Sequence, residues 1–181
     1  MKNETLIELQ NRIYNQNKDL GWHDEPRSFN TFVCLFHSEL SEAMEGDRKG
    51  LMDDHLPEYP MFQVELADFV IRVLDYLGSK GFIHYQDIYF DDDDMENQNE
   101  IELIARLHTG VSMCFQDYID RNKMVDHETK DGLASCVEAA FAFSSYNNIN
   151  LHKIILEKVE YNKHRADHKR ENRAMAGGKK Y

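Results

Sequence analysis

Residues 62–77 read FQVELADFVIRVLDYL, and this stretch decides the fold. It contains neither Gly nor Pro, and its apolar side chains recur at the three- and four-residue spacing of one helical face. The residues on that face are Phe62, Leu66, Phe69, Val70, Val73, Leu74 and Leu77. Pro60 precedes the stretch and Gly78 follows it, which is typical of the two ends of a helix. We therefore predict a helix from about Pro60 to Leu77 with a broad face packed into a core.

The same helical periodicity extends outward from this stretch in both directions. Five further segments are predicted as helices, at about 5–17, 28–45, 98–120, 131–146 and 150–165. The 181 residues include only 3 Pro and 9 Gly, which favours helices over an architecture of strands and turns. The sequence thus predicts an all-α protein, a bundle of about six helices in one domain over residues 1–165. The basic tail that follows, residues 166–181, is expected to lack regular structure unless it closes over another part of the molecule.

The composition of the chain disfavours several classes of protein. A formal net charge of −12 argues against binding to a nucleic acid duplex. Three cysteines without short spacing fit reduced thiols better than a disulfide framework or a zinc site. No segment approaches the roughly 20 apolar residues of a membrane span, so we expect a cytoplasmic protein with no membrane partner. The acidic run Asp91–Asp94 is predicted to be a solvated linker, because four like charges repel one another.

Two pairs of acids occur on consecutive predicted helices. Glu39 and Glu42 are three residues apart, as are Glu65 and Asp68, so each pair lies on one helical face. Apolar neighbours place both pairs at the edge of the predicted core. If the two helices pack antiparallel, the four carboxylates converge, and a hard cation such as Mg²⁺, or Mn²⁺ in its place, would offset their repulsion. The alternative is that these are ordinary surface acids in a chain with 33 Asp and Glu.

Candidate substrate-binding residues lie at the two ends of the chain. Lys158, Asn162 and Arg165 are spaced i, i+4 and i+7, so they share a helical face that could bind phosphate oxygens. The alternative is a solvated face near a basic helix end. Trp22 and His23 precede the second predicted helix. The indole either packs at the start of that helix or stacks on a nucleobase, with His23 contacting the edge of the base.

An internal repeat is a further hypothesis. The helix pair at 98–146 can be aligned with the pair at 28–77, so that His108 matches His37. The four acids of the first pair then align with residues that carry no carboxylate: Gly110, Met113, Gly132 and Ser135. On this interpretation the first pair is active and the second is a degenerate scaffold. The alternative is an accident of helical periodicity.

Five short stretches together resemble the MazG-like nucleoside triphosphate pyrophosphohydrolases. They are GWHDEPR at 21–27, HSELSEA at 37–43, ELADFVIRVLD at 65–75, EKVEYNKHR at 157–165 and GGKK at 177–180. An ExxE pair, an ExxD pair and a helix with Lys, Asn and Arg occur here in the order of the family pattern. The chain departs from that pattern in two places. Short members lack the region at about 90–148, and residues 166–176 are extra. In the first departure the chain is similar to the related all-α dUTPases, in which a second helical half is present and lacks the active acids.

The resemblance implies a role for each candidate residue. Mg²⁺ would be held by Glu39, Glu42, Glu65 and Asp68. The triphosphate would be contacted by Lys158, Asn162 and Arg165, and Trp22 and His23 would contribute to substrate binding. Glu42 is the candidate to orient or deprotonate the attacking water. The expected reaction is hydrolysis of a nucleoside triphosphate, with a deoxynucleoside triphosphate as the expected substrate, to a monophosphate and pyrophosphate.

Two other classes of function compete with this interpretation. A di-iron carboxylate bundle would need Glu-x-x-His pairs, and neither acidic pair has a His at that position. A catalytically silent nucleotide-binding or assembly module on the same fold is the stronger alternative, and an assay of pyrophosphate release separates it from the enzyme. We also expect a homodimer, because the apolar surface of six helices exceeds what one bundle core needs.

Overall fold

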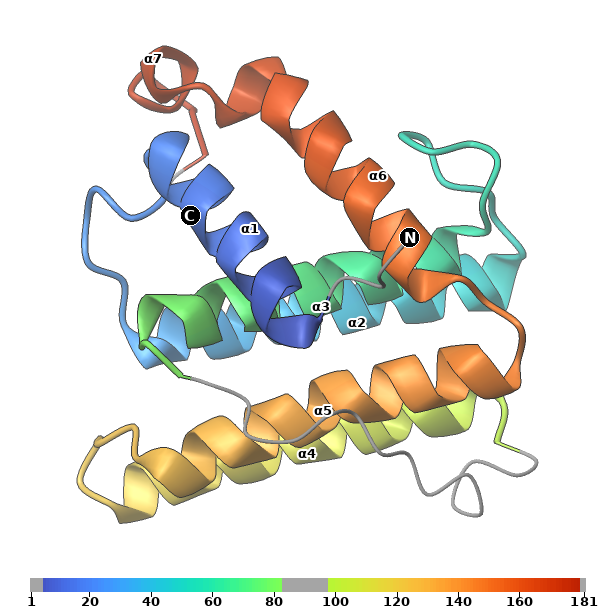
Figure 1. The fold of residues 1–181 in the computed structure, drawn as a ribbon, viewed down its shortest axis with the longest axis horizontal. Coiled ribbons are helices and arrows are strands. Elements are labelled where there is room, and N and C mark those ends of the chain that lie inside the picture. Colours follow the sequence, from blue (N-terminus) through green and yellow to red (C-terminus); the bar gives the residue numbers. More distant parts are fainter. Residues whose placement is uncertain (1–4, 83–97, 180–181) are drawn as a thin grey trace.

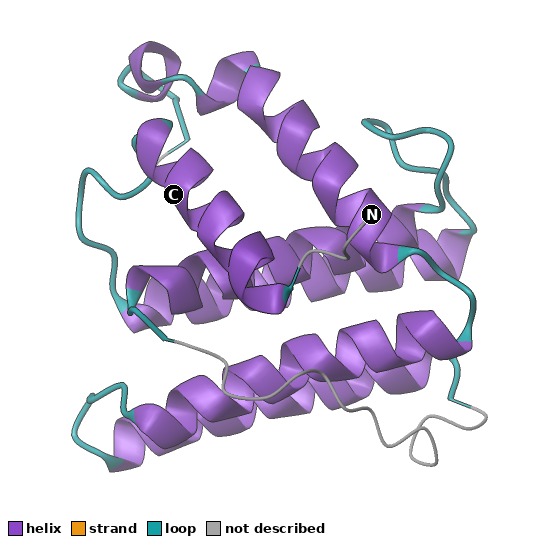
Figure 2. Ribbon diagram, in the orientation of Figure 1, coloured by secondary structure: helices purple, strands orange, loops and turns teal. Residues whose placement is uncertain are grey.

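The protein folds as an all-α bundle, as the sequence predicts (Figures 1 and 2). The computed structural model describes residues 5–82 and 98–179. Within these residues the α-helices are α1 (Leu6–Asp19), α2 (Phe29–Lys49), α3 (Met61–Ser79), α4 (Glu100–Asp120), α5 (His127–Tyr146), α6 (Leu151–His164) and α7 (Arg170–Arg173), with a 3₁₀ turn η2 at Ala166–His168. Outside the helices, Met52 and Pro60 form an isolated β-bridge. None of the described helices is long and apolar enough to cross a membrane.

Helix α3 occupies the centre of the bundle. It packs against α2 within one antiparallel pair, against α1 and α6 above and against α5 below, in the view of Figure 1. Its core-facing side chains include seven that are fully buried, Val64, Leu66, Phe69, Val70, Val73, Leu74 and Leu77. Burial of one such aliphatic side chain contributes about 1.5–3 kcal/mol, so the apolar stretch of α3 is a main source of stability. Its position brings residues of α3 next to almost every other part of the fold.

Two helix boundaries differ from the sequence expectation by four residues. Helix α2 does not end near Glu45 but continues through Gly46 to Lys49, and Gly50 ends it in the left-handed conformation with φ 61°. Gly46 serves close packing instead, because a Cβ there would lie 2.8 Å from the Met61 side chain at the start of α3. Helix α5 begins at His127, four residues before the expected start, since Asp126 caps it by accepting a hydrogen bond from the Thr129 amide.

The helices α2 and α3 form one antiparallel pair and α4 and α5 another, and α2 packs on α4 (Figure 1). The rings of His37 and His108 stack where these two helices meet, with their Nδ1 atoms 2.7 Å apart. This contact places two residues that the repeat alignment equates directly opposite each other. The repeat itself stays a prediction, and superposing the two helix pairs tests it.

Two of the four aligned positions in the second helix pair are packed too tightly to carry acids. A Cβ on Gly110 would lie 2.6 Å from the Cys136 Sγ, and one on Gly132 would lie 2.7 Å from the Cys114 Sγ. Both glycines therefore face the neighbouring helix across a close contact. The alignment equates them with Glu39 and Glu65, so the two pairs use these positions differently.

The described part of the tail is ordered where it closes over another part of the molecule. Residues 166–179 form η2, α7 and a turn that pack over the segment between α1 and α2. The tail thus meets the condition stated for its ordering, that it closes over another part of the molecule. The acidic run at 91–94 and the last two residues of the tail lie outside the described part of the chain.

Candidate active site

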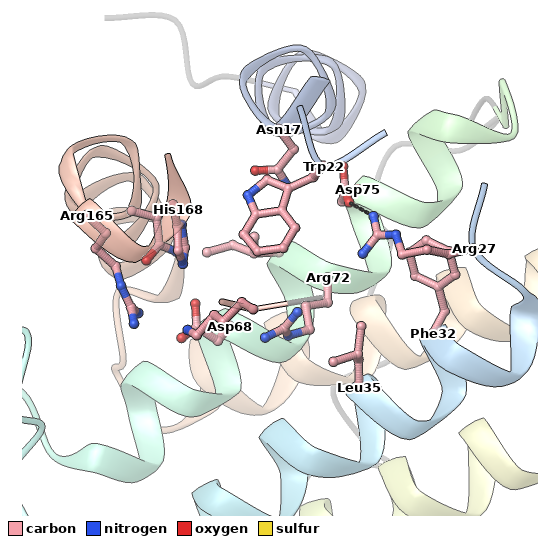
Figure 3. A pocket seen from close by; sticks show the side chains of 13 residues that line it. Asn17, Trp22, Arg27, Phe32, Leu35, Asp68, Arg72, Asp75, Arg165 and His168 are labelled. Carbon is pink, nitrogen blue, oxygen red and sulfur yellow. Dashed lines mark ion pairs between the residues drawn. The ribbon is translucent and has the colours of Figure 1, made fainter. Parts of the chain in front are cut away.

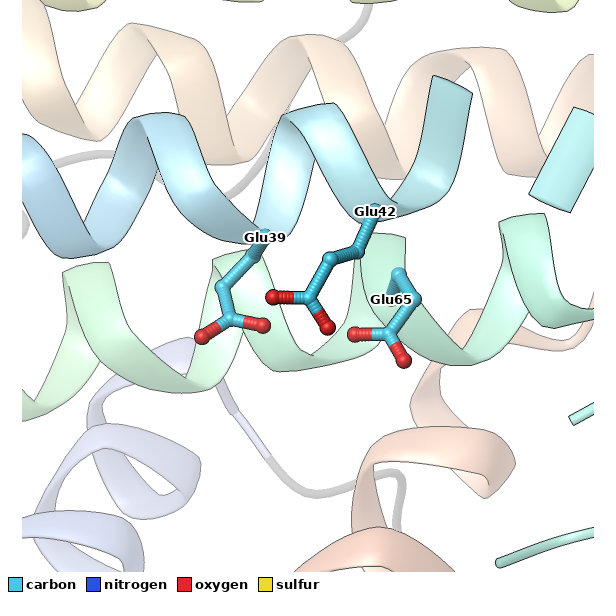
Figure 4. Close-up of side chains that lie close together, drawn as sticks. All are labelled: Glu39, Glu42 and Glu65. Atoms are coloured by element: carbon cyan, nitrogen blue, oxygen red, sulfur yellow. The ribbon is translucent and has the colours of Figure 1, made fainter. Parts of the chain in front are cut away.

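Three of the four predicted metal ligands converge between α2 and α3 (Figure 4). One carboxylate oxygen each from Glu39, Glu42 and Glu65 lies within 4.8 Å of the others. Glu39 and Glu65 are buried, with 5% and 6% of their surfaces exposed, whereas Glu42 is exposed. The local cause is the three-residue spacing on α2, which places Glu39 and Glu42 on the helical face beside α3. We call these three residues the acid cluster.

The acid cluster is electrostatically costly without a cation. Burial, followed by the neighbouring charge of Asp68, raises the pKa of Glu65 to about 9, and Lys158 offsets only part of this. Burial likewise raises the pKa of Glu39, although the Arg72 guanidinium opposes the shift. Both shifts favour the neutral carboxyl over the carboxylate. A bound cation would reverse that preference.

The donor set of the acid cluster fits a hard divalent ion. It consists of carboxylate oxygens alone, which suit Mg²⁺ or Mn²⁺. Ligand distances of 2.0–2.1 Å put two oxygens on opposite sides of Mg²⁺ about 4.2 Å apart. The three oxygens lie within 4.8 Å of one another, an upper bound that is close to this separation.

Asp68, the fourth predicted ligand, is one turn further along α3 than Glu65. Its Oδ2 lies 3.0 Å from the Nζ of Lys158, so its carboxylate is engaged by that lysine rather than by the acid cluster. Asp68 also lines the neighbouring pocket. It therefore connects the acid cluster, the basic residue of α6 and the pocket.

Lys158 has a different environment from the one expected for a phosphate ligand. Its side chain is 1% exposed, and its Nζ also lies 3.3 Å from the His55 Nδ1. Burial disfavours its charge, but the carboxylates of Asp68, Asp53 and Glu65 outweigh burial and raise the pKa of the ammonium. Lys158 is absent from the residues that line the pocket. Its Nζ therefore lies among acidic side chains rather than at the pocket wall.

A pocket of about 170 Å³ opens beside the acid cluster (Figure 3). An apolar cavity of about 150 Å³ accommodates a benzene ring, so this pocket has room for a planar ring of similar size. Its lining combines rings, cations, acids and apolar side chains: Asn17, Trp22, Arg27, Phe32, Leu35, Asp68, Ile71, Arg72, Asp75, Asn162, Arg165, His168 and Lys179. The pocket and the acid cluster are joined through Arg72, whose Nε forms an ion pair with the Glu39 carboxylate.

In comparisons with family models, curated proteins and solved structures, nothing matches this chain. The resemblance to MazG-like enzymes therefore stays a hypothesis carried by the sequence motifs.

The structure brings three of the five predicted substrate-binding residues to the pocket: Trp22, Asn162 and Arg165. The Oδ1 of Asn162 is buried and has no hydrogen-bond partner among the described residues. Arg165 donates from Nε and Nη2 to the two carboxylate oxygens of Asp167, at 3.0 and 2.8 Å. Polar groups of both residues thus lie at the pocket wall.

His23 is not among the residues that line the pocket. Its Nε2 lies 2.8 Å from the Asp75 Oδ1, and its ring packs edge-on against Tyr14 at 5.0 Å between centroids. His23 therefore supports the pocket from behind, because Asp75 does line it. His23 would therefore act on the edge of a bound base only indirectly, by way of Asp75.

Sequence reasoning missed several residues that line the pocket. Arg72 could have been found, because it follows Asp68 by four residues and Glu65 by seven, on the same face of α3. His168 and Lys179 carry no periodic signal. They reach the pocket only because the tail folds back toward the segment between α1 and α2.

Proposed function

We propose that the protein is a divalent-metal-dependent nucleoside triphosphate pyrophosphohydrolase that releases a nucleoside monophosphate and pyrophosphate. The observation that carries the proposal is the adjacency of two features. A cluster of three carboxylates lies beside a pocket whose wall combines an indole ring with several cationic side chains. The acid cluster suits a hard cation, the indole suits a nucleobase and the cations suit phosphates.

The chain's own residues supply most of the steps. The acid cluster, with Asp68 beside it, would hold the metal. A divalent cation there would offset the charge of the phosphates and favour deprotonation of the attacking water. Glu42 is the exposed member of the cluster and accepts a hydrogen bond from the Ser38 hydroxyl at 3.0 Å. It is therefore the best-placed group to orient or deprotonate that water.

Different residues of the pocket would bind the base and the phosphates of the substrate. The Trp22 ring offers a stacking surface for the base, which is worth about 1–3 kcal/mol in other nucleotide sites. Arg72, Arg165 and Lys179 line the same pocket and would contact phosphate oxygens, giving up their present carboxylate partners. Concentrating cations in one pocket resolves the conflict between an acidic protein and an anionic substrate.

The test measures pyrophosphate release from a panel of ribo- and deoxynucleoside triphosphates with Mg²⁺. We expect deoxynucleoside triphosphates to be preferred, and Glu42→Gln to lose activity by at least about 100-fold. Glu45→Gln is the matched control, because Glu45 is on the same helix but pairs with Arg48 and Lys49 instead of the acid cluster. Equal activity of wild type and Glu42→Gln would refute the assignment.

The second candidate function is a nucleotide-binding or assembly module without turnover. The same pocket favours it, since the pocket could hold a nucleotide whether or not the acids act on it. Binding of a non-hydrolysable triphosphate without release of pyrophosphate from any nucleotide would select this candidate over the enzyme.

Two properties complete the proposal, a cytoplasmic location and a homodimer. Several large apolar side chains are exposed on α4 and on the turn after it: Ile101, Met113, Ile119 and Met124. Such side chains favour self-association when they lie on one surface. Light scattering at micromolar concentration tests the dimer, and a monomer mass contradicts it.

A further inference from the structure

The tail holds the segment between α1 and α2 by an ion pair. Arg170, on α7, donates from Nε to the Asp24 Oδ2 at 2.8 Å and from Nη2 to its Oδ1 at 3.0 Å. This two-point geometry is the most specific form of an arginine–carboxylate contact. It joins residues 146 positions apart in the sequence. The contact therefore forms only when the tail returns to the segment between α1 and α2.

A second set of contacts surrounds Trp22 itself. The Arg173 guanidinium lies over the indole, 4.0 Å from the ring centroid, and its Nη2 donates to the Leu20 carbonyl at 3.2 Å. The His168 ring meets the indole edge-on at 5.2 Å. Trp22 is thus held by two side chains of the tail, and both Trp22 and His168 line the pocket.

The far end of the tail is tied to the end of α6. Lys179 Nζ lies 2.9 Å from the Asp167 Oδ2, the same carboxylate oxygen that Arg165 engages at 2.8 Å. Asp167 therefore joins a residue of the phosphate-binding proposal to the end of the tail. The tail thus contacts Trp22 on one side and Asp167, just after α6, on the other, and its residues His168 and Lys179 line the pocket.

The segment under the tail is shaped for this contact. Gly21 has φ +82°, which favours glycine, and a Cβ there would overlap the Arg170 guanidinium and lie 2.5 Å from the Asp24 Oδ2. Any other residue would strain the turn and push the ion pair apart. The close approach is thus a second feature, independent of the charges, that matches the tail to this segment.

We propose that residues 166–179 form a clamp that positions Trp22 as a wall of the pocket. Arg173 is the positioning residue for the indole, and the Arg170–Asp24 ion pair is the tie that keeps the clamp closed. The effect on nucleotide affinity rests on the proposed function. The closed position of the clamp itself does not.

The clamp is built to open without unfolding the bundle. The Arg170 and Asp24 side chains are 55% and 52% exposed, so their ion pair contributes little to global stability and is screened by salt. No residue of η2 or α7 is buried. Elements with few buried contacts open far more readily than a core does. The clamp therefore controls the pocket at a small cost in stability.

Trp22 is the only tryptophan in the chain, so its fluorescence reports on the clamp directly. We expect Asp24→Arg and Arg170→Asp each to shift the emission to longer wavelength and to increase quenching by acrylamide. The double variant, with the two charges exchanged, should restore the wild-type spectrum. Arg48→Asp is the control, because it breaks an exposed arginine–glutamate pair elsewhere on the surface. Unchanged emission in both single variants, or no recovery in the exchanged pair, overturns the clamp.

The kinetic consequence is measured with the triphosphate that the wild type hydrolyses fastest. Asp24→Arg and Arg173→Ala should each raise KM about five- to tenfold, while kcat stays within about twofold. The rise in KM corresponds to losing part of the binding free energy that base stacking on Trp22 supplies. The charge exchange should restore the KM of Asp24→Arg. An unchanged KM in a variant whose emission has shifted refutes the positioning role. If no nucleotide is hydrolysed, the proposed function fails, and the fluorescence arm still decides whether the clamp exists.

Discussion

Replacing Lys158 by Met should destabilise the protein more than any surface substitution on the same helix. The ammonium is 1% exposed and pairs with Asp68 at 3.0 Å. The nearby carboxyl groups of Asp53 and Glu65 add to the effect of Asp68 in raising the pKa of this ammonium. Met has a similar length and no charge. The variant therefore leaves the acids uncompensated while it keeps most of the packing.

The magnitude follows from how deeply the ion pair is buried. Removing one partner of a fully buried pair costs about 3–5 kcal/mol. The Asp68 side chain retains 17% exposure, so water can solvate part of the orphaned charge, and we expect the lower end of that range, about 3 kcal/mol. In a double-mutant cycle, Asp68→Asn combined with Lys158→Met should cost less than the sum of the two single changes, because neither charge is then left alone.

The assay is urea unfolding at pH 7 with EDTA, followed by circular dichroism. Lys163→Met is the control. Lys163 is also on α6, but its side chain is 52% exposed and its ion pair with Glu160 is long, at 3.6 Å. Its free energy of unfolding should stay within about 0.5 kcal/mol of the wild type. A similarly small effect for Lys158→Met would refute the argument. It would mean that Lys158 is not the counter-ion of the buried acids.

Three further predictions concern the acid cluster, the histidine pair and the second helix pair. Mg²⁺ at 100 times its Kd should stabilise the wild type by about 2.7 kcal/mol, and Glu39→Gln should lose this gain in a thermal shift. Burial lowers the pKa of His37 and His108 in the folded protein. As pH falls, these rings are therefore protonated in the unfolded chain before they are protonated in the folded protein. Stability should therefore drop below about pH 7, by at most about 1.4 kcal/mol per pH unit for each ring, and more steeply than in the double Gln variant. Gly132→Ala should overpack against Cys114, which lowers the free energy of unfolding by about 1–2 kcal/mol and lowers the melting temperature. Adding Cys114→Ala should restore the melting temperature.

The helices and the predicted core could be read from the sequence because helix formation is a local property. In α3, the spacing of residues such as Leu66 and Phe69 depends only on the 3.6-residue period, and both side chains are fully buried. The same period places Glu39 and Glu42 on one face, so their convergence could be anticipated. The exact ends were harder to predict, since Gly46 fits either a helix end or a close contact.

Side-chain partners could not be predicted in the same way. Asp68 shares the spacing of the other acids, yet it pairs with Lys158 of α6. His23 is adjacent to Trp22 in the sequence, yet it contacts Asp75 rather than lining the pocket. In each case the partner comes from another element, and its approach depends on how the helices pack.

The helical character of the chain and the shared helical faces of its acids follow from local periodicity, so both could be inferred before the structure was known. Only the tertiary structure decided which charges neutralise one another and what forms the pocket. The packing of α6 on α3 buries Lys158 among acids. The return of the tail across about 150 residues of sequence brings Arg170 to Asp24 and encloses Trp22. No local pattern encodes such contacts, because their free energy arises only when the whole bundle has brought both partners together.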